Sequence, residues 1–184
     1  MPKQKTKTEG AVAAGDGKYS FRIANLKKIA AGTGYSTAIG GVVEGARMLV
    51  GYIHKPRGTG SRMHSHKNEQ FNYVLEGTLR GSINGKKVVA PAGTLVYIPA
   101  NAPHCLVSDP DQDVIFLALK DLSQGIIGKA IDGTMTGAHY EPGFEPKPRR
   151  AAKKVAKVMH EFGSGTLHSG KGGPVVRSQK QAVA

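Results

Sequence analysis

Short apolar stretches, each about the length of one β-strand, follow one another through the middle of the chain. They lie at residues 46–54, 70–77, 78–84, 86–90, 94–99 and 113–120, and glycine, proline, asparagine or aspartate separates most of them. Asn84 and Gly85 favour a tight hairpin between two of these stretches, because both central turn positions need a positive φ. Short strands joined by tight turns, with no long helical period, are typical of a sandwich or closed barrel. The sequence therefore predicts an all-β fold.

Two histidines separated by one residue, His64 and His66, precede the stretch at 70–77. In an extended chain they point to the same side, so their imidazoles can share a metal ion. A third nitrogen ligand could come from His104, which follows the stretch at 94–99 and a proline turn. Two histidines alone are equally consistent with an exposed loop, so a metal site depends on the third ligand.

The spacing of these residues resembles the two sequence motifs of the cupin superfamily. The first motif is a glycine, five residues, H-x-H, three or four residues, a glutamate, six residues and a glycine. The matching positions are Gly58, His64, His66, Gln70 and Gly77. The second motif is a glycine, five residues, a proline, one residue, a glycine, two residues, a histidine, three residues and an asparagine. Its positions are filled by Gly93, Pro99, Asn101, His104 and Ser108, so the second glycine and the final asparagine are replaced.

This resemblance covers about residues 45–120 and implies a double-stranded β-helix, the jelly-roll barrel of the cupins. It also implies a homodimer and one divalent metal ion held by His64, His66, the residue at position 70 and His104. We expect the barrel to span residues 19–144.

Gln70 departs from the family pattern, which has a glutamate at this position, and Glu69 stands immediately before it. Either the amide oxygen of Gln70 is the ligand, or a shift in register brings Glu69 inward. Strand alternation favours Gln70, because a slip by one residue would also turn Asn72 and Val74 to the opposite face.

A shell of three imidazoles and an amide is neutral and suits transition metals rather than calcium or magnesium. We favour Fe(II), and Zn, Mn, Ni or Cu are alternatives. Such an ion keeps its full charge and favours an anionic substrate. Arg62 lies on the side of His64 by alternation, so it is either a carboxylate-binding residue or an exposed loop arginine. Asn72 would donate to a substrate oxygen or orient a ligand.

Two classes of function remain open. The first is a metal-dependent enzyme acting on a small oxygenated or carboxylate substrate. Three-histidine sites resemble those of Fe(II) dioxygenases, which is our preferred interpretation, whereas shells with glutamine resemble those of cupin lyases and isomerases of small anions or sugar derivatives. The sequence assigns no catalytic residue, although Tyr52 or Tyr97 could serve as the base of a lyase. The second class is a non-catalytic, ligand-binding cupin whose basic tail contacts nucleic acid.

The formal net charge of +13 is concentrated near the C-terminus, because residues 145–184 carry nine basic and two acidic side chains. We interpret residues 1–18 as a flexible basic head and residues 145–184 as a basic linker and tail. Val155, Val158, Met159 and Phe162 have helical spacing, and the residues after Gly163 resemble a small basic module of bacterial proteins of unassigned role. Such a tail could contact nucleic acid or an anionic surface without sequence specificity.

We expect a cytoplasmic protein without a transmembrane segment. The longest apolar runs, such as residues 114–119, fall far short of the roughly 20 residues that span a bilayer. Residues 1–18 have no apolar core of the kind found in secretory signals. The single cysteine, Cys105, cannot form an internal disulfide, which fits a reducing compartment.

Deleting residues 145–184 should separate the two classes of function. An enzyme whose site lies in the barrel should keep its turnover, whereas a protein that acts by contacting nucleic acid through the tail should lose that binding. Steady-state turnover and electrophoretic mobility shift of the full-length and shortened chains measure the two outcomes. Loss of turnover in a shortened chain that is still folded would contradict the placement of the site in the barrel.

Overall fold

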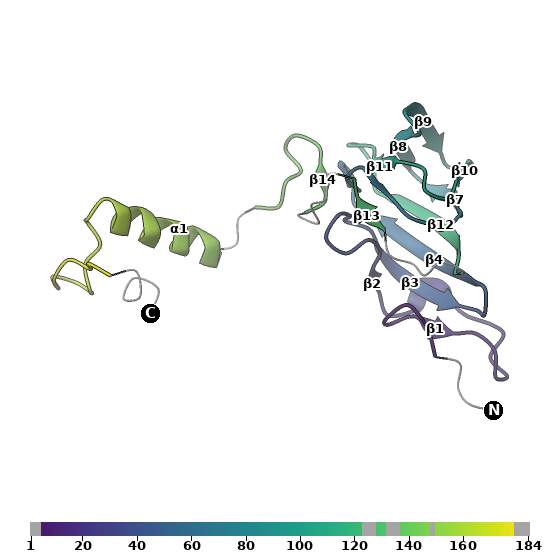
Figure 1. Ribbon diagram of the computed structural model, residues 1–184, viewed down its shortest axis with the longest axis horizontal. Helices are drawn as coiled ribbons and strands as arrows, with labels where there is room; N and C mark the ends of the chain where they lie inside the picture. Colours follow the sequence, from purple (N-terminus) through teal and green to yellow (C-terminus); the bar gives the residue numbers. More distant parts are fainter. Residues whose placement is uncertain (1–4, 123–127, 132–136, 148–149, 179–184) are drawn as a thin grey trace. The chain divides into compact units, whose positions relative to one another are not determined.

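The computed structural model describes residues 5–122, 128–131, 137–147 and 150–178. The chain divides into two compact units, Met1–Glu145 and Pro146–Ala184. The division into a head, a barrel and a tail that we expect from the sequence stays a prediction. The first unit consists of two β-sheets (Figure 1), so the all-β fold is confirmed.

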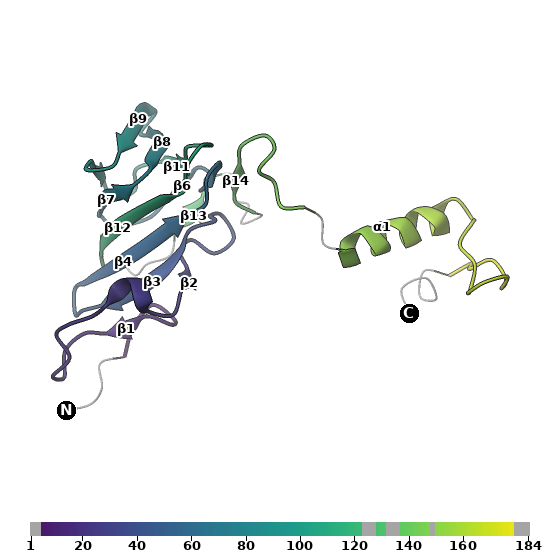
Figure 2. The ribbon, with the colours of Figure 1, turned by 180° about the vertical axis from the view of Figure 1, so that it is seen from behind.

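The first sheet joins strands that are far apart in the sequence. Its strand order is β1-β3-β4-β12-β7-β10, with β2 beside β3, and only β1 and β3 pair in parallel among the pairs of this sheet in the described residues. The strands are β1 (Val12–Ala13), β2 (Ile29–Ala30), β3 (Ile39–Glu44), β4 (Met48–Lys55), β7 (Gln70–Glu76), β10 (Leu95–Ile98) and β12 (Val114–Asp121). Seen from behind (Figure 2), the short 3-10 helix η1 (Ile23–Asn25) packs beside β3.

The second sheet has the order β13-β6-β11-β5-β14, and β8 pairs with both β11 and β9. Its strands are β5 (Thr59–Gly60), β6 (His64–Ser65), β8 (Thr78–Ile83), β9 (Lys86–Pro91), β11 (His104–Ser108), β13 (Lys129–Ala130) and β14 (His139–Tyr140). β11 therefore pairs with β5 and β6 as well as with β8, which ties together segments that are far apart in the sequence.

Period-two alternation explains why the core lies between the sheets. In β4 the buried positions are Leu49, Gly51, Ile53 and Lys55. Val74 and Leu79 are among the core residues with no exposed surface, and Leu106 and Phe116 add to the same cluster. The inward faces are thus apolar along most of their length and become polar where the histidines lie.

The turns have the backbone conformations that their residues predict. Asn84 and Gly85 have φ of 49° and 74° in the β8–β9 hairpin, which confirms the hairpin prediction. Asn101 stands in place of the glycine of the second motif and has φ of 61°, a left-handed conformation that asparagine tolerates better than most residues. Gly77 has φ of 76°, and a Cβ there would collide with the carbonyl oxygen of Asp113.

A buried carboxylate attaches the N-terminal segment to the first sheet. Glu44, which is 2% exposed, accepts hydrogen bonds from the backbone N–H groups of Lys7 at 2.6 Å and Thr8 at 3.0 Å. The ammonium of Lys7 donates to the carbonyl oxygen of Leu122 at 2.9 Å. The segment continues into β1, where Val12 pairs with Val43. Residues 7 and 8 are therefore fixed at the edge of the sheet.

The second unit contains α1 (Arg150–Gly163), which confirms the helix predicted in the tail. Lys157 and Glu161 pair across one helical turn at 3.7 Å. After the helix, the backbone N–H of Val176 donates to the carbonyl oxygen of Leu167 at 2.8 Å, and the side chain of Val176 is buried. In the described parts of the chain, no helix combines the length and the apolar character needed to cross a membrane.

Replacing Glu44 with alanine should release the N-terminal segment, because two backbone N–H groups lose their acceptor. We expect a loss of about 1–3 kcal/mol in the free energy of unfolding and faster amide exchange at Lys7 and Thr8. Glu76→Ala, which removes an exposed carboxylate from β7, is the matched control. Hydrogen exchange that is identical in the two variants would contradict this role of Glu44.

Candidate metal centre

Three histidines from the two cupin-like motifs meet on the inner side of the second sheet. His64 in β6 lies directly opposite His104 in β11, and His66 follows two residues later. The ring centroid of His104 lies 4.1 Å from that of His64 and 4.8 Å from that of His66. All three side chains are buried, and one ring nitrogen from each lies within 4.8 Å of the others. The structure thus brings together the three histidines that the sequence selects.

Hydrogen bonds to the backbone fix which nitrogen of each ring carries the proton. In each ring Nδ1 lies 2.8–2.9 Å from a backbone carbonyl oxygen two residues away, and the carbonyls belong to Arg62, Asn68 and Ala102. A carbonyl oxygen only accepts, so each Nδ1–H donates and each Nε2 keeps a free lone pair.

The three imidazoles are neutral at physiological pH. Burial is the main cause that lowers the pKa of His64 to about 3 and the pKa values of His66 and His104 to about 4. The Nε2 atom of His66 is buried and has no hydrogen-bond partner among the described residues. Three neutral nitrogen donors, one of them buried and unpaired, fit a transition-metal ion.

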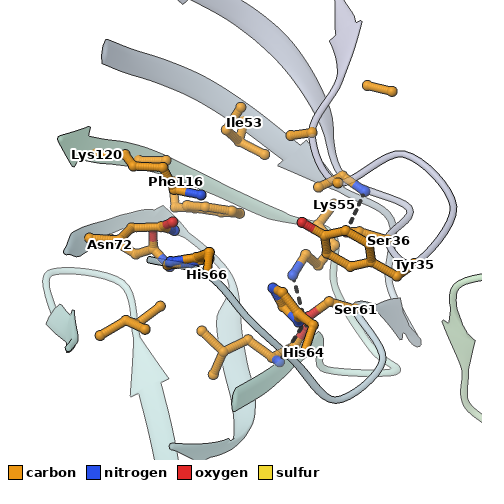
Figure 3. A pocket seen from close by; sticks show the side chains of 18 of the residues that line it. Tyr35, Ser36, Ile53, Lys55, Ser61, His64, His66, Asn72, Phe116 and Lys120 are labelled. Atoms are coloured by element: carbon orange, nitrogen blue, oxygen red, sulfur yellow. Dashed lines mark hydrogen bonds between the residues drawn. The ribbon is translucent and has the colours of Figure 1, made fainter. Parts of the chain in front are cut away.

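The histidines line a cavity of about 160 Å³ between the two sheets (Figure 3). Gln70 and Asn72, on the inner face of β7, line the same cavity, and the Nε2 of Gln70 donates to the Oδ1 of Asn72 at 2.8 Å. This bond uses neither the carbonyl oxygen of Gln70 nor the amide hydrogens of Asn72. Ile53 and Phe116 contribute apolar wall (Figure 3).

Gln70, and not Glu69, faces the cavity, as strand alternation predicts. Glu69 is exposed, its backbone N–H donates to the carboxylate of Asp121 at 2.9 Å, and its hydrogen bond raises the pKa of Tyr97. The role of Gln70 as a metal ligand stays a prediction.

Arg62 is not among the described residues that line the cavity. Its backbone helps to position His64. The backbone N–H of Arg62 donates to the carbonyl oxygen of Tyr35 at 2.9 Å, and the carbonyl oxygen of Arg62 accepts from Nδ1 of His64. Strand β6 begins only at His64, so the alternation that placed Arg62 beside His64 does not extend to it. Its predicted contact with a substrate carboxylate stays a prediction without support from this geometry.

Sequence reasoning missed two lysines and a tyrosine. Lys55 continues the inward face of β4, and Lys120 lies on β12 opposite Gln70; both line the cavity. Alternation along these two strands would have found them. Tyr35 comes from the loop before β3 and stacks on His64 with ring centroids 4.4 Å apart, and no sequence signal marks it.

Burial alters the acid–base properties of these three groups. It lowers the pKa values of Lys55 and Lys120 to about 8 and raises the pKa of Tyr35. The tyrosines that we considered as bases from the sequence are elsewhere. Tyr97 is 47% exposed and stacks on Phe71 outside the cavity, and Tyr52 is not among the described lining residues.

Comparison with known families agrees with this geometry. Residues 51–120 match the family described as Cupin domain, and residues 148–184 match a family of unknown function (DUF6496). The first unit therefore has a cupin-like β-sandwich fold, and the predicted fold class is confirmed. A search of curated proteins gave no match.

One solved structure with a TM-score of 0.50 has the same fold at low sequence identity, and further solved structures are similar with lower TM-scores. The polyketide cyclase RemF from Streptomyces resistomycificus is 21% identical with a TM-score of 0.50, and the match covers 57% of this chain and 80% of that chain. An RmlC-like cupin from Shewanella frigidimarina is 21% identical with a TM-score of 0.46, covering 55% and 87%. The DMSP lyase DddQ from Ruegeria pomeroyi is 18% identical with a TM-score of 0.45, covering 51% and 47%. This chain spans less than half the length of the DMSP lyases that it matches.

The lowered histidine pKa values predict that the metal-free protein loses stability as the pH falls from about 6.5 towards 4. In this window the unfolded chain binds protons that the folded imidazoles do not, so the free energy of unfolding decreases. From pH 7 to pH 5 each histidine contributes a loss of up to about 2 kcal/mol. Urea denaturation at each pH, in the presence of a chelator, measures this decrease in the free energy of unfolding.

His66→Gln should show a smaller decrease over the same interval, because one of the three titrating groups is gone. An equal decrease in the wild type and in His66→Gln would show that His66 titrates normally in the folded protein.

Proposed function

We propose that the first unit is a metal-dependent enzyme acting on a small anionic substrate, with Fe(II) dioxygenase chemistry as the first candidate. One observation carries the proposal: three neutral Nε2 atoms converge in a cavity whose described lining contains two lysines and no carboxylate. Such a site attracts an anion to the position where a metal ion would be held.

His64, His66 and His104 would hold the ion, and the fourth donor would be the carbonyl oxygen of Gln70, which its hydrogen bond to Asn72 leaves unused. Zn, Mn, Ni or Cu suit the same nitrogen donors, so the donors alone do not select iron. When bound, the ion would supply Lewis acidity and, as Fe(II), one-electron chemistry with oxygen.

The chain's own residues would bind and orient the substrate. The amide of Asn72, 2% exposed and facing the cavity, can donate to a substrate oxygen while its Oδ1 stays occupied by Gln70. Ile53 and Phe116 exclude water from one side of the cavity. Exclusion of water strengthens each charge interaction inside.

A lyase or isomerase is the second candidate, because the cavity also contains groups that can move a proton. Lys55 and Lys120, with pKa values of about 8, are partly deprotonated near neutral pH and suit a general base. The phenol of Tyr35 lies beside His64 and could act as an acid. This interpretation replaces Tyr52 and Tyr97 with residues that the cavity contains.

A homodimer and contact of the basic tail with nucleic acid or an anionic surface remain proposals, as does a cytoplasmic location. Support for a homodimer comes from the outer face of β7 and β10, where adjacent apolar side chains are exposed. They are Tyr73, Leu75, Leu95 and Tyr97. The alternative of a non-catalytic binding cupin would use the same cavity without turnover.

Metal analysis of protein purified without chelator or nickel affinity resin tests the site. We expect about one ion per chain in the wild type, loss of tight binding in His64→Ala and His104→Ala, and retention in Gln70→Glu, whose carboxylate keeps an oxygen donor. His139→Ala, which removes a histidine outside the cluster in the same unit, is the control. Unchanged metal content in both cluster variants would overturn the assignment.

Oxygen uptake over a panel of small carboxylates and diketones distinguishes the reactions. Substrate-dependent uptake by the iron-loaded protein supports a dioxygenase. Product formation without uptake supports the lyase or isomerase, and a metal-loaded protein that binds but converts none of the panel supports the binding cupin.

A further inference from the structure

Lys55 and Lys120 approach the histidines from opposite ends of one strand pair. β4 and β12 are antiparallel, with Lys55 opposite Val114 and Lys120 opposite Leu49. Six residues of β12 separate these two positions, which corresponds to about 20 Å of strand. Both side chains turn into the cavity, where Figure 3 shows Lys120 on the side of Asn72 and His66 and Lys55 on the side of His64.

Neither ammonium forms a direct salt bridge in the described part of the chain, although the negative charge of the neighbouring Asp121 acts on Lys120 and partly offsets the lowering of its pKa by burial. Lys55 donates to the carbonyl oxygen of Leu106 at 2.7 Å and lies 5.6 Å from the ring centroid of Phe116. Lys120 has no hydrogen-bond partner among the described residues, and the next residue, Asp121, accepts from the backbone of Glu69. A buried ammonium without a direct ion-pair partner is costly, so two of them in one cavity point to a ligand of opposite charge.

The polar groups around Lys120 fit a carboxylate. Gln70 lies opposite Lys120 across β7 and β12, and Asn72 lies two residues along on the same inner face. The ammonium of Lys120 and the amide hydrogens of Asn72 are donors that line the same cavity, and the described lining contains no acidic residue. Donors of this kind bind carboxylates through charge-assisted hydrogen bonds.

The size of the cavity limits the ligand. Its volume is about 160 Å³, close to the roughly 150 Å³ of a cavity that admits benzene. A four-carbon dicarboxylate, with about eight non-hydrogen atoms, is on this scale. Two anionic groups on one such molecule would match the two cationic ends of the cavity.

We propose that the cavity recognises a small dicarboxylate, with one carboxylate bound by Lys120 and Asn72 and the other paired with Lys55. The proposal deepens the proposed function by naming its substrate class, and it rests on that function only for the statement that the bound dicarboxylate is a substrate. The binding itself uses residues outside the histidine cluster.

Calorimetric titration of the full-length, metal-free protein tests the proposal. The probes are succinate, the monoanion butyrate and the neutral succinamide. We expect succinate to bind at least about tenfold more tightly than butyrate, and succinamide to bind more weakly than either, because a hydrogen bond to a charged group contributes about a factor of ten or more. Equal affinities for succinate and butyrate would overturn the proposal.

Substitution of the lysines locates the interaction. Lys120→Met and Lys55→Met each put an unbranched apolar side chain in place of the lysine. Each variant should bind succinate at least about tenfold more weakly. In at least one of the two variants, the loss of butyrate affinity should be smaller than the loss of succinate affinity. Lys87→Met, on the exposed side of β9, is the control and should bind succinate as the wild type does. Far-UV circular dichroism and thermal unfolding establish that each variant is folded. A folded Lys120→Met that binds succinate as tightly as Lys87→Met contradicts the proposal.

His104→Ala separates this proposal from the proposed function. If His104→Ala loses metal but binds succinate, both assignments hold independently. If the wild type binds no metal and the lysine variants still lose succinate, the dicarboxylate site stands and the metal-dependent function fails. If metal binding depends on the histidines but succinate binding does not depend on the lysines, the metal-dependent function stands and the dicarboxylate site fails.

Discussion

The pairing of β11 with its neighbours is the interaction on which the rest of the structure depends. This strand places His104 against His64, pairs further along with β5, and forms its longest ladder with β8. The carbonyl oxygen of Leu106, in the middle of the strand, accepts from the ammonium of Lys55 and from the hydroxyl of Ser61, so Lys55 also has a structural contact. One strand therefore fixes the relative positions of both histidine-bearing segments and anchors a lysine from the opposite sheet. Loss of its register would disperse the site and open the core together.

Electrostatics gives the cavity its chemical character. The backbone carbonyls that hold each Nδ1–H leave three lone pairs facing one point, and burial keeps the rings uncharged. The lysines add positive charge without any acidic residue in the described lining. An ion held by the rings would not be neutralised by the protein, so the counter-charge has to arrive with the ligand. Metal and anion are in this sense coupled occupants of one cavity.

Much of the fold and part of the site could be predicted from the sequence, for identifiable reasons. Glycine and asparagine at positive φ mark the turns, and the spacing of His64, His66 and His104 reflects their strand positions. Alternation also placed Gln70 correctly. It does not extend to Arg62, because β6 is only two residues long and begins at His64. Tyr35 reaches the cavity from a distant loop, a tertiary contact for which local pattern contains no information.

The inward lysines also have an evolutionary consequence. They occupy positions in β4 and β12 next to the inward residues Ile53, which is part of the apolar core, and Ala118, which packs against it. Mutation to leucine or methionine at either position would relieve a desolvated charge and is the substitution that drift and selection for stability favour. If the lysines bind the ligand as proposed, persistence of both in a lineage would reflect continued selection for ligand recognition, and their replacement by apolar residues would mark relatives that have lost it.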